Sequence, residues 1–106
     1  MRSGDKFVAM LGFARRSGKI VCGIDTVKCV RKKLYVLAVG YSASENLYAA
    51  MKTEAEKRNT PLVLASTLES AAGGNIKAIG IADAEMARAM LEYAETDPEN
   101  YKIINR

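Results

Sequence analysis

A short basic segment is the part of this sequence best suited to binding chemistry. Arg15-Arg16-Ser17-Gly18-Lys19 precedes the apolar run Ile20-Val21-Cys22, and Gly23 then stands at the expected start of a helix. A helix N-terminus offers unpaired backbone N–H groups, and flanking cations add charge-assisted hydrogen bonds to phosphate oxygens. We therefore expect an anion, such as the backbone of RNA, to bind here. The alternative is that Gly18 ends a helix, the arginines are solvated and Gly23 permits a tight turn.

The residues that most enzymes need are missing from the chain. It contains no histidine, which excludes a His-based triad and a Cys/His zinc site, and its two cysteines cannot supply the four ligands of a tetrahedral metal site. We expect Cys22 and Cys29 to be buried as small hydrophobic side chains. No phosphate-loop motif occurs, and no pair of carboxylates can be assigned to a shared pocket. The sequence predicts no catalytic residue, metal, cofactor or small-molecule substrate.

Positive charge is concentrated in the first third of the chain. Residues 1 to 33 carry nine cations and two anions, a net charge of +7, whereas residues 34 to 106 carry a net charge of −3. A domain with this distribution is able to present a basic face to a polyanion while its other surface repels one. The alternative is that these lysines and arginines only solvate exposed helix faces.

The spacing of apolar residues divides the chain into alternating helices and strands. Helices are expected over residues 4 to 17, from Gly23 through Val30, over 44 to 59, from residue 66 to the Gly73-Gly74 break, and from Asp83 through Ala94. Strands are expected over 20 to 22, 34 to 39, 62 to 65 and 78 to 81. Residues 96 to 106 are either an edge strand at YKII or a tail packed on the domain.

These elements predict a single domain over residues 1 to 106, with residues 96 to 106 unassigned, because the length suits one compact unit. The fold class is α/β. Alternation of helices and strands at this spacing implies a three-layer α/β/α sandwich around a central, mixed, four-stranded sheet.

The motif from Leu11 to Lys19, L-G-x-A-R-R-x-G-K, resembles the opening of small bacterial members of a superfamily of kink-turn-binding ribosomal proteins. That superfamily includes the archaeal large-subunit ribosomal protein seven-Ae and the eukaryotic protein thirty-e. The resemblance continues through VLA, SASEN, RNTPLV, LESAAG and AIGIAD in the right order, and it covers nearly the whole domain. It implies an α/β/α sandwich that docks on kinked RNA and reads tandem sheared G·A pairs with the start of its second helix.

The resemblance also implies which residues contact the RNA. The start of the second helix supplies Gly23, Ile24, Asp25 and Thr26, and the loop after the fourth helix supplies Gly73, Gly74, Asn75, Ile76 and Lys77. Lys19, Lys28 and Arg31 would engage phosphates, with Arg15 and Arg16 as supporting charge. For Ile76 the alternative is a core residue that leads into the strand at 78 to 81.

The match to the strongest binders, which open this helix with Gly-Thr-Asn-Glu, is imperfect. Asp25 stands in place of the asparagine, so an acceptor with a negative charge replaces an amide that both donates and accepts, and Thr26 is shorter than glutamate. The leading hypothesis is therefore a non-catalytic RNA-binding protein of ribosomal type. The alternative is a protein-interaction module on the same fold that no longer recognises kink-turns.

The expected partner is structured RNA, either ribosomal RNA or a kink-turn in a messenger or ribosome-associated RNA. No apolar run approaches the roughly 20 residues of a membrane helix, and the opening residues lack the apolar segment of a signal peptide. We expect a cytoplasmic, ribosome-associated protein without a membrane partner.

Overall fold

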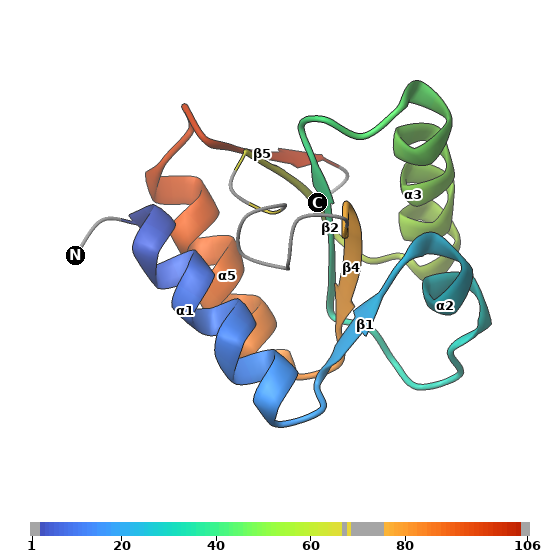
Figure 1. Cartoon of the computed structure of the whole chain (residues 1–106), viewed down its shortest axis with the longest axis horizontal. Helices are drawn as coiled ribbons and strands as arrows, with labels where there is room; N and C mark the ends of the chain where they lie inside the picture. The colour runs from blue at the N-terminus through green and yellow to red at the C-terminus, as the bar shows by residue number, and fades with distance from the viewer. Residues whose placement is uncertain (1–2, 67, 69–75, 105–106) are drawn as a thin grey trace.

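A computed structural model of the chain describes residues 3–66, 68 and 76–104 (Figure 1). Its helices are α1 (Ser3–Arg16), α2 (Ile24–Cys29), α3 (Glu45–Arg58) and α5 (Ala84–Thr96). Its strands are β1 (Ile20–Cys22), β2 (Val36–Gly40), β3 (Leu62–Ala65), β4 (Ala78–Ile81) and β5 (Tyr101–Ile104). The short helix expected from residue 66 falls mostly outside the described residues. Leu68, which lies within that expected helix and is described, is buried.

The strands form one mixed sheet with the order β1-β4-β2-β3-β5. β2 and β3 are parallel and α3 connects them, whereas the other three pairings are antiparallel. The sheet has five strands where the sequence predicted four, because YKII pairs with β3 as an edge strand. Short-range patterns could not show this pairing, since Leu62 and its partner Ile104 are far apart in the sequence.

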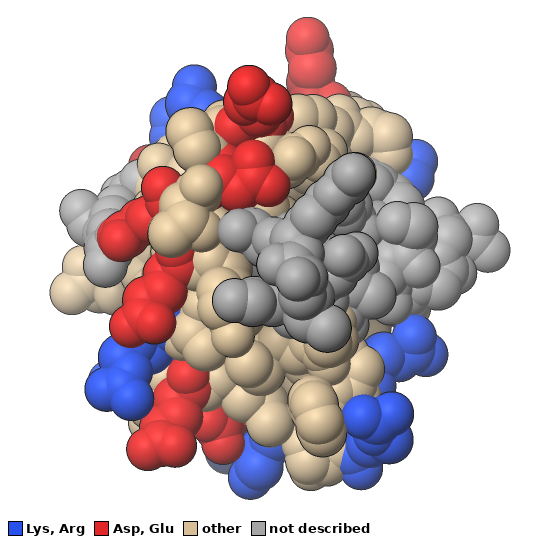
Figure 2. Space-filling view, turned by 90° about the vertical axis from the view of Figure 1, so that its left-hand side faces the viewer, with Lys and Arg blue, Asp and Glu red and all other residues tan. Residues whose placement is uncertain are grey.

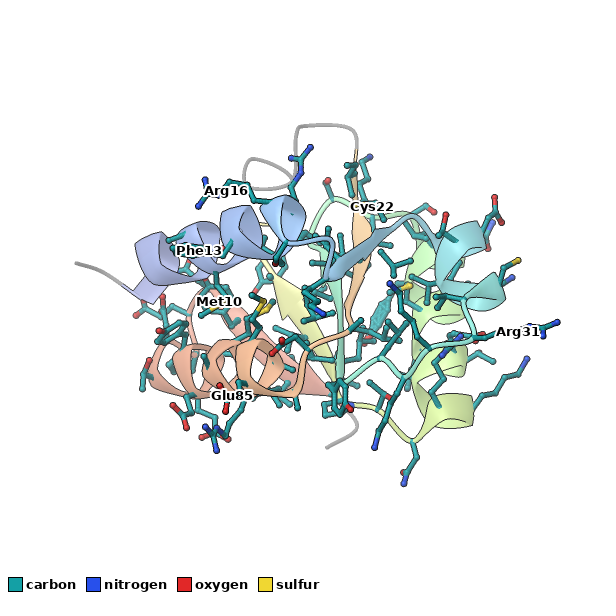
Figure 3. All side chains as sticks on the ribbon, turned by 90° about the horizontal axis from the view of Figure 1, so that it is seen from below. Met10, Phe13, Arg16, Cys22, Arg31 and Glu85 are labelled. Atoms are coloured by element: carbon teal, nitrogen blue, oxygen red, sulfur yellow. The ribbon has the colours of Figure 1, made fainter. Side chains whose placement is uncertain are left out.

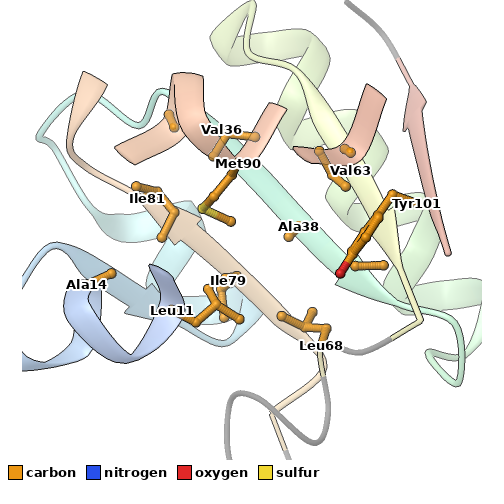
Figure 4. Packing of buried hydrophobic residues seen from close by; sticks show 13 residues of the cluster. Leu11, Ala14, Val36, Ala38, Val63, Leu68, Ile79, Ile81, Met90 and Tyr101 are labelled. Carbon is orange, nitrogen blue, oxygen red and sulfur yellow. The ribbon is translucent and has the colours of Figure 1, made fainter. Parts of the chain in front are cut away.

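Helices cover both faces of the sheet, as the α/β/α sandwich requires (Figure 1). Successive side chains of a strand point to opposite faces, so Val36 and Ala38 of β2 face the core beneath α1 and α5, whereas Leu37 and Val39 face the core beneath α2 and α3. Figure 4 shows the first core, where Met90 of α5 and Leu11 of α1 meet the strands. β2 is fully buried for this reason, as its continuous apolar run predicts.

Three of the helix boundaries predicted from the sequence are confirmed. Gly18 has a left-handed φ of 70° just after α1, and Asn59 has a φ of 54° at the end of α3. The side chain of Asp83 accepts hydrogen bonds from the backbone N–H groups of Glu85 and Met86 at the start of α5. Local capping chemistry therefore set these boundaries.

Two expectations were wrong in detail. The second strand begins at Val36 rather than Leu34, although the N–H of Tyr35 already donates to the carbonyl oxygen of Ile81. Cys29 is exposed, because it lies on the outer side of α2, and Cys22 is only partly buried beside the core.

Candidate nucleic-acid interface

The two segments expected to contact RNA line one hollow of about 410 Å³. Its walls come from the end of β1, the first turn of α2, one residue of α3 and the start of β4. The lining residues are Cys22, Gly23, Ile24, Asp25, Thr26, Leu47, Ile76, Lys77 and Ala78. Six predicted site residues, at positions 23 to 26, 76 and 77, therefore lie together in space although about fifty positions separate the two groups.

Backbone hydrogen bonds fix the rim of the hollow. The N–H of Gly23 donates to the carbonyl oxygen of Ala78 at 2.8 Å, and the N–H of Gly40 donates to that of Lys77 at 2.9 Å. The first bond ties the start of α2 to the start of β4, and the second ties β4 to the end of β2. Backbone hydrogen bonds therefore tie both walls of the hollow to the same sheet.

Gly23 is the N-cap of α2 and has a φ of 88°, a conformation that side chains disfavour. It offers no side-chain oxygen to the N–H groups of the first turn, and no side-chain hydrogen bond caps them. N–H groups in a first turn have no partner within their own helix. They lie at the edge of the hollow and are available to acceptor atoms of a ligand.

The hollow combines an apolar floor with a polar rim. Ile24, Leu47 and Ile76 are partly buried, whereas Asp25, Thr26 and Lys77 are exposed. Apolar side chains suit the flat face of a nucleobase, and the rim offers a carboxylate, a hydroxyl and an ammonium group to its polar edges and to phosphate. Ile76 lines the hollow and also packs against the core beneath α1 and α5, so its position fits both expected roles, contact with RNA and packing in the core.

The other predicted cations do not line the hollow. Lys19 precedes β1 at the end opposite Gly23, about 13 Å away along an extended backbone. Lys28 is exposed one helical turn beyond the hollow, and Arg31 is exposed past the end of α2, where Figure 3 shows it at the far right. These three side chains can meet a phosphate backbone only if the ligand extends beyond the hollow. Gly73, Gly74 and Asn75 lie outside the described residues.

A residue that the sequence analysis did not assign holds α2 in place. The guanidinium of Arg58, at the end of α3, donates to the carbonyl oxygen of Val27 at 2.7 Å and to that of Val30 at 2.8 Å. Its Nε donates to Oε1 of Glu54 at 3.2 Å, and Glu54 is only 8% exposed. Arg58 thus binds the C-terminal carbonyls of the helix whose first turn lines the hollow.

The signal for this arrangement was only partly present in the sequence. Glu54 and Arg58 have the i,i+4 spacing of a helical ion pair, but nothing local indicates that α2 provides the other acceptors. Three lining residues, Cys22, Leu47 and Ala78, were likewise not assigned, because as apolar core residues they carry no chemical signature of their own.

The opposite side of the molecule is acidic. Exposed carboxylates follow α5 and the turn after it, at Glu85, Glu92, Glu95 and Glu99. On the face formed by α1 and α5, Figure 2 shows acidic side chains in a column at the left, with Lys and Arg side chains at the lower right and also at the left and upper left. Exposed carboxylates thus gather along α5, and basic side chains share this face of the molecule.

Within residues 3–66, 68 and 76–104, no three His, Cys, Asp or Glu residues lie close enough to hold a metal ion. No helix in these ranges combines the length and the apolar character needed to cross a membrane.

Comparison with known proteins adds information on the fold. No protein-family model matches the chain, and no curated protein is significantly similar to it. A solved structure of a protein of unknown function from Bacillus halodurans C is similar, with a TM-score of 0.71 and 20% sequence identity. The alignment covers 83% of this chain and 95% of the other. The chain therefore shares an α/β fold with a protein from Bacillus halodurans C.

Proposed function

We propose that this protein is a non-catalytic RNA-binding protein that docks the hollow between α2 and β4 onto structured RNA of the kink-turn type. One observation carries the proposal: the start of α2 and the segment before β4, which the resemblance to kink-turn-binding ribosomal proteins marks as contact regions, line the same hollow. Backbone bonds from Gly23 to Ala78 and from Gly40 to Lys77 hold both regions in place. A preformed surface loses little entropy when it binds.

The chemistry of the hollow fits an unstacked nucleotide next to a duplex. Ile24 and Ile76 offer apolar contact to a base, while the ammonium group of Lys77 and the N–H groups of the first turn of α2 favour phosphate and sugar oxygens. Lys28 and Arg31 extend the positive charge along the direction of α2. The acidic surface of α5 disfavours RNA on the other side and so orients the encounter.

Asp25 offers the sharpest test of this interface, because its carboxylate stands at the rim among groups that favour phosphate. Asp25→Asn removes one negative charge and restores the amide found in strong binders. We expect it to tighten binding of a kink-turn RNA about fivefold to tenfold. The measurement is a titration of labelled RNA with each protein at fixed salt.

The matched control is Glu92→Gln, which makes the same change of charge on the exposed side of α5. It should leave the dissociation constant within about twofold of the parent value, because screening weakens interactions between distant charges. Equal effects of the two substitutions would show that net charge, not contact at the hollow, controls binding. Absence of RNA binding by the parent protein and both variants would refute the proposed function.

A second function, a protein-interaction module, is favoured by two features of the hollow. Its floor is apolar, with Ile24, Leu47, Ile76 and Ala78, and Asp25 adds a charge that repels phosphate. A protein partner that co-purifies with the chain and remains bound after nuclease treatment would support this function. Loss of all bound partners after nuclease treatment would favour RNA.

A further inference from the structure

The C-terminal end of α1 carries an exposed aromatic side chain with a cation above it. Phe13 is 56% exposed, and among the described residues only Tyr41 is a comparably exposed large hydrophobic side chain. The guanidinium carbon of Arg16 lies 4.9 Å from the centroid of the Phe13 ring. No carboxylate within the described ranges forms an ion pair with Arg16. This Phe13–Arg16 pair is not explained by packing, since the core-facing side of α1 is formed by Leu11 and Ala14.

The backbone beneath the pair is held firmly. The N–H of Lys19 donates to the carbonyl oxygen of Ala14 at 2.8 Å, and the N–H of Gly18 donates to the carbonyl oxygen of Arg15 at 3.4 Å. These two hydrogen bonds form a Schellman motif. The hydroxyl of Ser17 donates to the carbonyl oxygen of Phe13 at 2.7 Å. The Phe13–Arg16 pair therefore stands on a helix end whose carbonyl groups are largely satisfied, and it does not need to fold before it binds a ligand.

The pair lies away from the core and near the candidate interface. In Figure 3, Met10 lies between α1 and α5, whereas Arg16 extends from the other side of α1. β1 connects this end of α1 to the hollow, and the seven positions from Arg16 to Gly23 span at most about 23 Å of extended chain, which is the rise of about seven base pairs. An RNA that fills the hollow is large enough to reach both.

We propose that Phe13 and Arg16 form a second RNA contact, a stacking platform for one unpaired nucleobase next to the structured element bound at the hollow. This inference rests on the proposed function. Bases in single-stranded segments stack on aromatic rings and on guanidinium planes, and every base has a face that allows such stacking. The exposed Lys19 beside the pair supplies positive charge for the phosphate of that nucleotide. The exposed cations Arg16 and Lys19 favour a polyanion such as RNA over an uncharged protein surface.

The test compares a blunt kink-turn RNA with the same RNA carrying a three-nucleotide single-stranded extension at either end. For the parent protein, one of the two extensions should raise the affinity about tenfold, equivalent to about 1.4 kcal/mol. Phe13→Ala and Arg16→Ala should each remove most of this gain and leave the affinity for the blunt RNA within about threefold of the parent value. An extension that adds no affinity, or a gain that Phe13→Ala leaves intact, would overturn the inference.

Two matched controls separate stacking from charge and bulk. Arg88→Ala removes an exposed arginine from α5, and Tyr41→Ala removes the other exposed aromatic side chain among those that the structure describes. Both variants should keep the tenfold gain. Loss of the gain in either control would show that the effect does not belong to the Phe13–Arg16 pair.

A fluorescence readout reports stacking directly, because the chain contains no tryptophan. Phe13→Trp introduces a single indole at an exposed position, and a base stacked on it should quench its emission. An extension with abasic sugars at its three positions should not quench. Equal quenching by both extensions would contradict stacking. If the blunt RNA does not bind but single-stranded RNA quenches the indole, the proposed function is wrong and the stacking platform is supported. If neither RNA has any effect, both proposals are wrong.

Discussion

Gly23 combines a φ of 88° with a ψ of 146°, a region of backbone space that is nearly restricted to glycine. A Cβ built at this position meets no atom within 4 Å. The cost of a side chain here therefore comes from backbone strain alone and not from a steric clash with the surroundings.

We expect Gly23→Ala to lower the free energy of unfolding by about 1–2 kcal/mol and to displace the first turn of α2, because the alanine backbone relaxes toward negative φ. The matched control is Gly12→Ala in α1, where an added Cβ also meets nothing within 4 Å. This change should stabilise the protein by about 0.5–1 kcal/mol, since alanine is the better helix former. Denaturant titration measures the free energy of unfolding of both variants. A Gly23→Ala variant that is stabilised to the same extent as Gly12→Ala would refute the strain argument.

Arg58 acts on α2 from a distance of about thirty positions in the sequence. α2 has six residues, and a helix this short is not stable by itself. One guanidinium donates to the carbonyl oxygens of Val27 in α2 and of Val30 just beyond it, and to the carboxylate of Glu54. The geometry of the hollow therefore depends on a side chain that does not line it.

We expect Arg58→Ala to lower the free energy of unfolding by about 2–3 kcal/mol, because it leaves the largely buried Glu54 carboxylate and two backbone acceptors without this donor. In the Arg58→Ala variant, the amide hydrogens of α2 should exchange with solvent faster than those of α3. Glu54→Gln should cost less, about 1 kcal/mol, since the bonds from Arg58 to α2 remain possible. Arg58→Ala with unchanged stability and unchanged exchange in α2 would contradict this role.

At the scale of elements, β4 packs closely against the segment that precedes β2. β4 lies between β1 and β2, and a Cβ on Gly80 would approach Cδ1 of Leu34 to 2.8 Å and Cδ2 of Leu37 to 3.1 Å. Leu34 and Leu37 are fully buried in the core beneath α2 and α3. Glycine at position 80 therefore permits a close approach between a strand and leucine side chains.

Gly80→Ala should destabilise the protein by about 1–3 kcal/mol through overpacking. The penalty should shrink in a Leu34→Val background, because valine lacks the Cδ1 atom that the new methyl group would meet. A double-mutant cycle in urea measures this coupling. A Gly80→Ala penalty of equal size in both backgrounds would show that Leu34 is not the limiting contact.

Sequence patterns predicted the elements well where the determining interactions are local. The alternation of helices and strands followed from apolar spacing, and Gly18, Asn59 and Asp83 marked helix ends through their own backbone or side chain. Local patterns do not decide whether residues 101 to 104 form a strand, because β5 depends on pairing with β3. The hydroxyl of the buried Thr60 donates to the carbonyl oxygen of Leu34 at 3.1 Å, a contact that no pattern around RNTPLV could specify.

The candidate site shows the same division. The identity of its two segments was available from motifs, and the structure brings Gly23 and Ile24 together with Ile76 and Lys77 at one hollow. The sequence did not predict where the cations lie relative to the hollow, because the position of Lys19 in the chain does not show which end of β1 faces the hollow. Arg58 was missed because its partners, Val27 in α2 and Val30 just after it, lie about thirty positions away in the sequence.

At the scale of the whole molecule, we propose that this protein combines positive charge with a shaped hollow to bind structured RNA. Positive charge in the first third of the chain lies on and around α1, β1 and α2, whereas the exposed carboxylates of α5 lie beside α1, on the other face of the sheet from α2. Charge alone would attract any RNA, and its contribution weakens as salt rises. Recognition of a particular shape must come from the hollow, and the two contributions are separable by experiment.

The most direct measurement is a titration of the protein into a kink-turn RNA and into the same RNA with its G·A pairs replaced by Watson–Crick pairs, at two salt concentrations. The account predicts that the protein prefers the kink-turn by more than about tenfold, or 1.4 kcal/mol, and that this ratio persists at the higher salt while both affinities fall. Equal affinity for the two RNAs at both salt concentrations would contradict recognition through the hollow. Absence of binding to either RNA would contradict the claim altogether.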